Sequence, residues 1–269
     1  MEESNSTNKC RRTASDALHI SELPIGLMVD VSAYLAKPSR ALLAVAFSAP
    51  SSSWRSNDLI HLPLPITTAI ISASQWDTLD FEDIERELAN KLKDDDINAV
   101  LKSINAQDVL KRLKLCGCIN IKGHGLNLLQ GSVVLEQIDI SLAEKNDYQY
   151  IEPEPKISEE VVMPILDSII SADGCSLKHI QFPFKFRREP PVLEFQTRYN
   201  LQFLSREIIC AKCNEAAAPD TYWMDDYCIM NKTCYDCLAP LCGDCRRDDE
   251  NGGFSLKWCN ACDKTYCTD

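Results

Sequence analysis

The stretch 110-LKRLKLCGCINIKGHGLNLLQGSVVLEQIDISL-142 decides how the middle of this chain folds. It opens on apolar residues that alternate with polar ones at Leu113-Lys114-Leu115, the pattern of a half-buried strand. A second alternating run, Ile138-Asp139-Ile140, begins 25 residues after Leu113. Self-similarity at a period of roughly 20 to 50 residues is the mark of architectures in which successive units stack on one another.

Two further runs carry the same alternation, Leu79-Asp80-Phe81 and Ile180-Gln181-Phe182. Apolar residues with helical spacing lie between the runs, and two sets stand out: Ile97, Val100, Leu101 and Ile104 after a cap at Asp94–Asp96, then Val161, Ile165, Leu166, Ile169 and Ile170. Strands that alternate with helices predict an α/β fold. The long step before Ile180 contains an acidic, proline-containing segment, 144–158, which we interpret as a surface loop.

The quoted stretch resembles the cysteine-containing class of leucine-rich repeat. In that resemblance Cys118 and Asn120 stand at the turn after the strand, and the layer behind it is filled by Ile119, Ile121, Leu126 and Leu129. The resemblance implies a short α/β solenoid over residues 58–206. No other metal ligand is near Cys116 and Cys118 in the sequence, so we interpret both as structural.

The N-terminal part begins with a polar arm, residues 1–17, which we expect to be disordered. The stretch 23-LPIGLMVDVSAYL-35 has helical spacing, with Leu27, Val31, Tyr34 and Leu35 on one face and Met28 beside it. Lys37-Pro38 breaks this helix, and Ser39 can cap a second one that ends before Pro50. Two helices this short cannot bury all their apolar residues, so a partner or the rest of the chain must cover them.

This segment, residues 18–57, resembles an F-box. Leu23-Pro24 and the closing Tyr34-Leu35 fit its first helix, SRALLAVAFSAP fits its second, and Trp54 stands near its late tryptophan. The resemblance implies docking onto the Skp adaptor of a Skp–cullin–F-box ubiquitin ligase. The partner-binding positions would be Leu23, Pro24, Leu27, Val31 and Leu35. The alternative is a helical pair that packs only on its own domain.

The C-terminal part, residues 207–269, is rich in cysteine. Eight of these residues form four Cys-x-x-Cys pairs: Cys210/Cys213, Cys234/Cys237, Cys242/Cys245 and Cys259/Cys262. A pair of thiolates three residues apart can hold one side of a tetrahedral metal, and a second pair can close the other side. The pattern therefore predicts a small module with two zinc ions. Cys228 and Cys267 could be further ligands or buried free thiols.

Two ligand pairings remain open, a sequential one and a cross-brace that joins the first pair to the third. The order of the pairs resembles RING and FYVE-type zinc folds. No histidine follows His179, although RING modules usually use one, and the basic histidine-containing motif of FYVE domains is absent. A structural or partner-binding zinc module is therefore favoured over one that recruits a conjugating enzyme or binds phosphoinositides.

Composition narrows the function classes. A formal net charge of −12 argues against a general nucleic-acid binder, so the basic and aromatic segment 182–206 is interpreted as an irregular strand and cap. No stretch approaches the roughly 20 apolar residues of a membrane span, and the first residues lack a signal-peptide core. We expect a cytoplasmic or nuclear protein with reduced thiols; a disulfide-rich secreted tail is the alternative.

Catalytic signatures are missing from the sequence. The four histidines are scattered, and the nine glycines form no phosphate-binding loop. We therefore predict a non-catalytic substrate-recognition adaptor, in which the repeats and the zinc module hold an unknown target protein. A RING-like ligase or a non-catalytic zinc and leucine-rich-repeat scaffold is the alternative, and a nuclear nucleic-acid-binding zinc protein ranks last.

Overall fold

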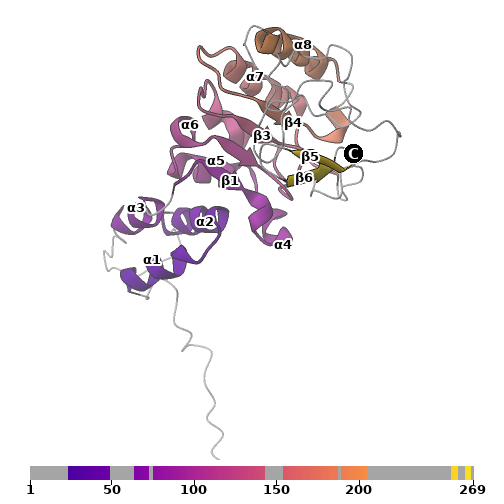
Figure 1. The fold of residues 1–269 in the computed structure, drawn as a ribbon. Coiled ribbons are helices and arrows are strands. Elements are labelled where there is room, and N and C mark those ends of the chain that lie inside the picture. Colours follow the sequence, from indigo (N-terminus) through magenta and orange to yellow (C-terminus); the bar gives the residue numbers. More distant parts are fainter. Residues whose placement is uncertain are drawn as a thin grey trace, which may run out of the picture.

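The computed structural model describes residues 24–48, 64–72, 75–142, 154–186 and 189–204, and two short strands at 256–259 and 264–267. Helices and a four-stranded parallel sheet make up the larger part (Figure 1). The predicted mixed α/β class is therefore confirmed. Among the described residues, no helix has the length and apolarity needed to cross a membrane.

The parallel sheet is the centre of the fold. Its strands follow one another in chain order: β1 (Thr78–Asp80), β2 (Arg112–Lys114), β3 (Gln137–Asp139) and β4 (His179–Gln181). The register pairs Leu79 with Leu113, Leu113 with Ile138, and Ile138 with Ile180. These four side chains are fully buried. The strand positions expected from the four alternating runs are thus confirmed.

The opposite face of the sheet carries polar side chains, because successive residues of a strand point to opposite faces. Most of them are buried too: Lys114, Gln137, Asp139, His179 and Gln181. Charges that leave water need a partner. Lys114 Nζ lies 3.2 Å from the Asp80 carboxylate on the neighbouring strand, and Asp139 accepts bonds from the backbone N–H and the hydroxyl of Ser141.

Helices cover the apolar face of the sheet. The first is α5 (Asp94–Ser103), whose side chains Ile97, Val100 and Leu101 are buried as its spacing predicts. Asp94 is the first helical residue, so the aspartates form the first turn instead of preceding it. There they favour the positive end of the helix dipole, and Asp96 accepts the backbone N–H of Lys93.

The next helical layer is formed by η4 (His124–Leu129) and α7 (Glu159–Ile170). α5 and α7 both contact η4. Ile165, Leu166, Ile169 and Ile170 of α7 are buried, as predicted, but Val161 is only half-buried and Val162 takes the core position. The remaining helices between β1 and β2 are short: η3 (Phe81–Asp83), α4 (Arg86–Ala89) and α6 (Ala106–Val109).

The turn after β2 packs into the core of the sheet. Cys118 and Leu126 are buried in the same core as Leu113. Asn120 is half-buried, and its side-chain amide donates to the backbone carbonyl of Asn90, 2.5 Å away, in the preceding unit. A polar side chain here satisfies a backbone group that the short α4 leaves without a helical partner.

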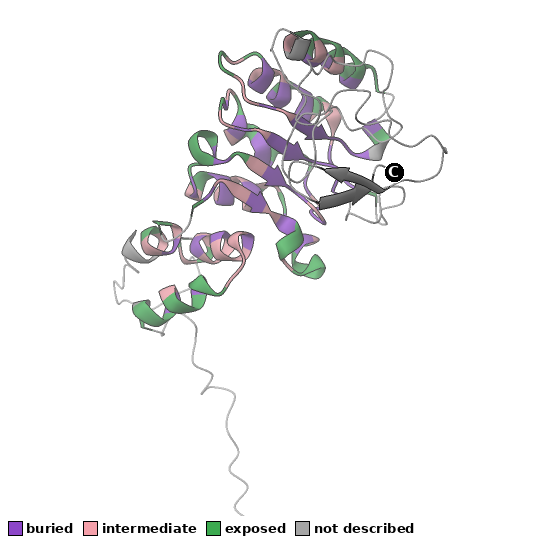
Figure 2. Ribbon diagram, viewed as in Figure 1, coloured by how far each residue is buried: buried purple, intermediate pink, exposed green. Residues whose placement is uncertain are grey.

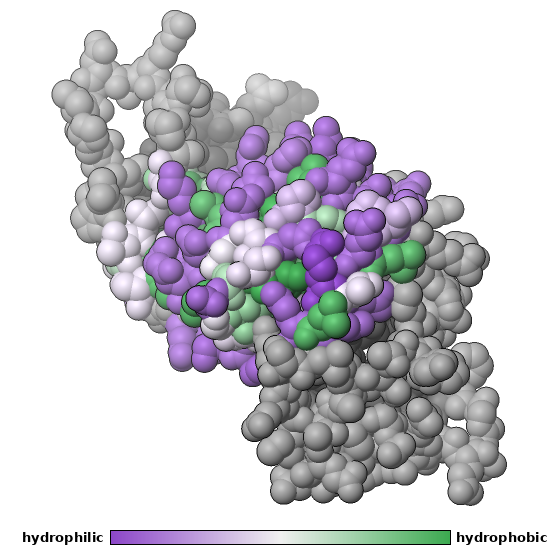
Figure 3. All heavy atoms as spheres, turned by 90° about the horizontal axis from the view of Figure 1, so that it is seen from above, coloured by the Kyte–Doolittle hydropathy of each residue, from purple (hydrophilic) through white to green (hydrophobic). Residues whose placement is uncertain are grey.

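The sheet end near β4 is closed by η5 (Phe184–Phe186) and α8 (Pro190–Leu204). The expected irregular strand is therefore a helix. The aromatic side chains of Phe182, Phe186, Phe195 and Tyr199 are buried against one another, so they cannot stack on nucleic-acid bases. The face seen from above in Figure 3 is mostly hydrophilic, with hydrophobic residues scattered through it.

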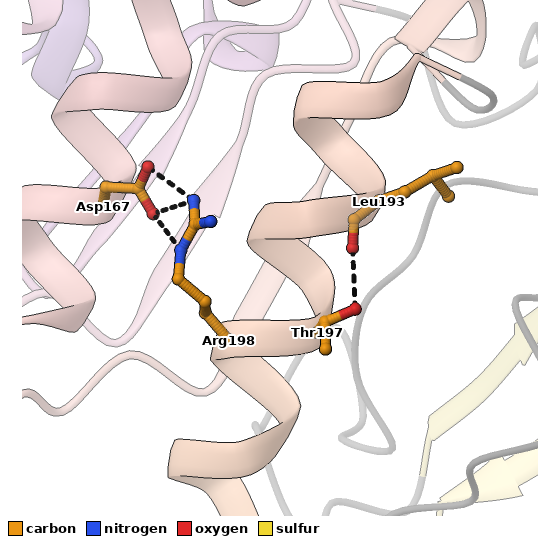
Figure 4. Close-up of polar contacts among 4 residues, drawn as sticks. All are labelled: Asp167, Leu193, Thr197 and Arg198. Carbon is orange, nitrogen blue, oxygen red and sulfur yellow. Dashed lines mark hydrogen bonds and ion pairs between the residues drawn. The ribbon is translucent and has the colours of Figure 1, made fainter.

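A bidentate ion pair joins α8 to α7. Arg198 donates from Nη2 to both carboxylate oxygens of Asp167 at 2.7 Å, and its Nε also reaches one of them at 3.1 Å (Figure 4). On the preceding residue, the Thr197 hydroxyl donates to the Leu193 carbonyl within the helix. Both Arg198 and Asp167 are partly exposed, so the pair fixes geometry more than it adds stability.

The end of the predicted acidic loop is part of the packed structure. Pro155 and Ile157 are buried. The backbone N–H groups of Lys156 and Ser158 donate to carbonyls of the turn after β2. Residues 143–153, the first part of that loop, lie outside the described residues.

In the described part of the chain before the sheet lie three helices: α1 (Ile25–Ala33), α2 (Lys37–Ser48) and α3 (Leu64–Ser72). α2 begins at Lys37, two residues before the predicted cap at Ser39, because Pro38 is compatible with the first turn of a helix. The apolar spacing does not predict α3, which packs against both other helices. Residues 1–23 and Trp54 lie outside the described residues.

The helices are joined to the sheet through shared contacts. Ala41 of α2 is fully buried in the same core as Trp76 and Leu79. The indole N–H of Trp76 donates to the carbonyl of Ile71 in α3 at 2.6 Å. Lys37 Nζ contacts the Asp77 carboxylate at 2.8 Å. The helices and the first strand are therefore held as one unit.

Candidate functional site

The first helix presents an apolar face to solvent. Leu27 and Val31 are each 46% exposed and Tyr34 is 91% exposed. These residues, at i, i+4 and i+7, follow one another along one side of the helix. We call them the α1 face. Figure 2 shows α1 largely in the colour of exposed residues, in contrast to the buried sheet.

The opposite side of α1 holds the helix on the molecule. Met28 is buried in a small cluster with Ala44 of α2 and Ile70 of α3. Ser32, one turn later, is also buried, and its hydroxyl donates to the carbonyl of Val29. Val29 is half-buried and packs against the same cluster. The apolar side chains of Leu27 and Val31 lie outside this packed stripe.

The end of α1 is capped by an arginine from the next helix. Arg40 donates from Nε to the carbonyl of Ser32 at 2.8 Å. Its Nη2 donates to the carbonyls of Ala33 and Leu35, at 2.9 and 3.1 Å. The Ser32 and Ala33 oxygens belong to the last turn of α1, where a helix leaves carbonyls short of internal partners, and the Leu35 oxygen lies just beyond it. One guanidinium thus ties the C-terminal end of α1 to α2.

Charge is fixed just beyond this end of α1 by the Lys37–Asp77 pair. The hydrogen bond from Lys37 lowers the pKa of the Asp77 carboxyl, and the charge of Lys37 lowers it further. Asp77 also accepts two backbone N–H groups through its own carbonyl, from Lys111 and Arg112. The carboxylate therefore anchors α2 at the point where the sheet begins.

The predicted partner-binding residues divide into three groups. Leu27 and Val31 lie on the α1 face. Pro24 is exposed immediately before α1, and Leu35 is half-buried after it. Leu23 lies outside the described residues.

Tyr34 is the residue missing from the predicted partner positions. Its helical spacing from Leu27 places Tyr34 on the same face, and this spacing could have identified it as a partner-binding residue. Its exposure could not be read from the sequence, because exposure depends on where α2 and α3 pack. Tyrosine is enriched among the residues that dominate binding energy at protein interfaces.

The predicted zinc ligands lie mostly outside the described residues. This holds for Cys210, Cys213, Cys228, Cys234, Cys237, Cys242, Cys245 and Cys262. The other two end the antiparallel strands β5 (Leu256–Cys259) and β6 (Lys264–Cys267), in which Cys259 pairs with Lys264. The four residues that connect these strands thus include Cys262. Within the described parts of the chain, no group of three or more metal-ligating side chains comes together.

Cys116 and Cys118 lie in the turn after β2, next to the core of the sheet. Cys118 is fully buried, and its thiol lies 3.7 Å from the carbonyl of Cys116. Burial raises the pKa of the Cys118 thiol, and the neighbouring Cys116 raises it further. A thiol that resists ionisation is a poor metal ligand and a poor nucleophile. This agrees with a packing role for Cys118.

Comparison with known proteins gives no relative: no family model, no curated protein and no solved structure matches the chain. Function therefore has to be argued from the residues. The α1 face offers apolar area and one phenolic hydroxyl, which suits binding to another protein surface.

Proposed function

We propose that this protein is the substrate-recognition adaptor of a Skp–cullin–F-box ubiquitin ligase. The α1 face would dock onto the Skp adaptor, and a target protein would be held by the remainder of the chain. The protein itself would catalyse no reaction. The observation that carries this proposal is the solvent-exposed row of Leu27, Val31 and Tyr34 on a short helix whose sequence resembles the start of an F-box.

The small centre of the helical unit supports the same interpretation. α3 completes a three-helix unit with α1 and α2, and Met28, Ala44 and Ile70 form its small centre. A unit with so small a centre leaves apolar side chains uncovered. A partner surface that takes up the α1 face would bury them, which is the energetic reason to expect docking here.

The middle of the chain would act as a short leucine-rich-repeat array. Four parallel strands in chain order, with Leu79, Leu113, Ile138 and Ile180 in register, support this proposal. So does the hydrogen bond from Asn120 to the previous unit, since neighbouring units of a repeat array must satisfy one another's backbone groups.

The C-terminal residues would form a module with two zinc ions, bound by the four Cys-x-x-Cys pairs. The antiparallel pairing of β5 and β6 supports this proposal, because Cys259 ends the first of these strands and Cys262 follows it by three residues in the sequence. Metal binding would then drive the folding of the module. Cytosolic or nuclear location, where thiols stay reduced, is part of the same proposal.

A fixed geometry would help such an adaptor. Ala41, Trp76 and the Lys37–Asp77 pair connect the helical unit to the sheet by direct contacts. A target held by the body of the protein would then stand at a set distance and orientation from the bound Skp adaptor. Fixed orientation is a general way to favour reaction between two bound partners.

The test is co-purification of the full-length chain with the Skp adaptor. Leu27→Asp with Val31→Asp should abolish binding, because it places charges on the α1 face. Leu201→Asp, on the exposed side of α8, is a matched control and should bind like the wild type, since Leu201 is also an exposed leucine. Failure of the folded, zinc-loaded wild type to bind would reject the proposal.

A RING-like ligase is the second candidate, favoured by the order of the four cysteine pairs alone. It predicts ubiquitin chains when the protein is mixed with activating and conjugating enzymes and no cullin. A non-catalytic scaffold predicts neither chains nor Skp binding. The same purified protein can be used for both assays.

A further inference from the structure

We infer that Arg40 is the positioning residue of the α1 face. It holds α1 in the orientation that presents Leu27, Val31 and Tyr34, and it does not itself belong to the contact surface. This inference rests on the proposed function for its binding test. It also has a test on the free protein, which does not depend on any partner.

The weak packing of α1 makes this role necessary. Among the α1 residues whose side chains the structure describes, Met28 and Ser32 are buried and Val29 is half-buried. A nine-residue helix is marginal on its own, and most helical stability in proteins comes from a packed apolar face. The apolar side chains that could supply such packing, Leu27 and Val31, face solvent instead.

The geometry of the guanidinium compensates for this. Arg40 reaches the carbonyls of Ser32 and Ala33 at the C-terminal end of α1 and that of Leu35 just beyond it, all within 3.1 Å. A positive charge at this end also interacts favourably with the helix dipole. The planar fork of donors lets one side chain fix several acceptors, which a lysine cannot reproduce.

The position of Arg40 separates it from the contact surface. It lies on α2, in the same helix that places Ala41 in the main core. Its side chain is directed at the backbone of α1, and its Nε contact with Ser32 is partly buried. The α1 face is formed by other residues, so Arg40 can act on a partner only by holding α1 in place.

This arrangement predicts a kinetic signature. If α1 leaves its binding orientation for part of the time, the apparent affinity equals the intrinsic affinity multiplied by the fraction of molecules that hold this orientation. The bound complex itself is unchanged. Arg40→Gln should therefore weaken Skp-adaptor binding by roughly tenfold through a slower apparent association rate, with the dissociation rate unaltered. Arg40→Lys should restore part of the affinity, because it keeps the charge near the helix end.

The experiment measures both rate constants by surface immobilisation of the Skp adaptor, with full-length, zinc-loaded protein in solution. Arg198→Gln is the matched control, since it removes an arginine that pairs with Asp167 on α7 and should leave both rates unchanged. A faster dissociation rate for Arg40→Gln would mean that Arg40 contacts the adaptor, and it would overturn the inference.

Hydrogen exchange on the free protein separates the two proposals. In Arg40→Gln the α1 amides, such as that of Met28, should exchange at least roughly tenfold faster, while amides of α7 keep their protection. Unchanged exchange in α1 would overturn the positioning role. If the wild type binds no adaptor but α1 still loosens in Arg40→Gln, the proposed function fails and the positioning of α1 stands.

Discussion

Oδ1 of Asp94 accepts the backbone N–H of Gly125 at 2.8 Å, across 31 residues of sequence. The same oxygen accepts the N–H of Gly123 at 2.9 Å, and Oδ2 accepts that of Lys122 at 2.8 Å. A Cβ on Gly125 would lie 2.7 Å from the Asp94 carbonyl oxygen, so only glycine permits this approach. One carboxylate thus joins the start of α5 to the turn before η4.

We predict that Asp94→Asn lowers the stability of the protein by about 2 kcal/mol, because a neutral amide cannot accept all three backbone hydrogen bonds. Urea unfolding followed by circular dichroism would measure the change. Asp95→Asn is the control, since Asp95 is exposed in the same helical turn and loses the same charge. Equal losses in the two variants would mean that the helix dipole, and not the backbone bonds, explains the effect.

The Lys37–Asp77 pair makes a pH-dependent prediction. Because the pKa of Asp77 is lowered in the folded state, its contribution to stability is present above the unfolded pKa of about 3.9 and disappears as the pH falls through the lowered value. Lys37→Met should therefore cost about 0.5 kcal/mol at pH 7, a small loss because both side chains are partly exposed.

The measurement is the unfolding free energy of the wild type and of Lys37→Met between pH 7 and pH 3. The difference between the two curves should shrink toward the acid end, as the pH falls through the lowered pKa of Asp77. A difference that stayed constant over the whole range would assign the effect of the substitution to packing of the lysine stem.

Cys118 should be resistant to alkylation in the folded protein. Its thiol is fully buried and its pKa is raised, so little thiolate is present to react. With iodoacetamide at pH 8, we expect Cys118 to react at least roughly tenfold more slowly than Cys175, which is half-exposed. Peptide mapping after timed quenching gives both rates from one sample, and urea should remove the difference.

Metal analysis should find two zinc ions per chain. Cys259→Ser with Cys262→Ser should reduce the content to one or less, because a four-ligand site that loses two thiolates binds zinc poorly. Cys116→Ser is the control and should retain both ions, since Cys116 lies in the turn after β2. A zinc content near zero in protein purified under reducing conditions would reject the zinc module.

The strands of the sheet could be predicted because each one is marked by a pattern within a few neighbouring residues. Each strand is a short alternating run, and Leu79, Leu113, Ile138 and Ile180 occupy equivalent places in it. The helix spacing of α5 and most of α7 could be read for the same reason. The short helices α4 and α6 could not, since their four residues hold too little of the helical period to be distinguished from a loop.

Contacts between distant residues set the limits of prediction at the candidate site. Leu27 and Met28 are adjacent apolar residues, yet only Met28 is buried, because Ala44 and Ile70 come to its side of the helix. Asp94 likewise resembles an ordinary helix-start residue until its partners near Gly123 are known. Sequence spacing narrows the face of a helix but does not say which face is covered.

Trp76 has a consequence for how this protein could be divided or recombined. Its ring belongs to the core of the sheet, while its N–H is bonded to the end of α3. The N-terminal helices therefore do not form a domain that can be removed before β1 without exposing core residues. A chimaera that exchanges them for the helices of another protein would need to keep Trp76 and its acceptor at Ile71, or the graft would expose core surface at the junction.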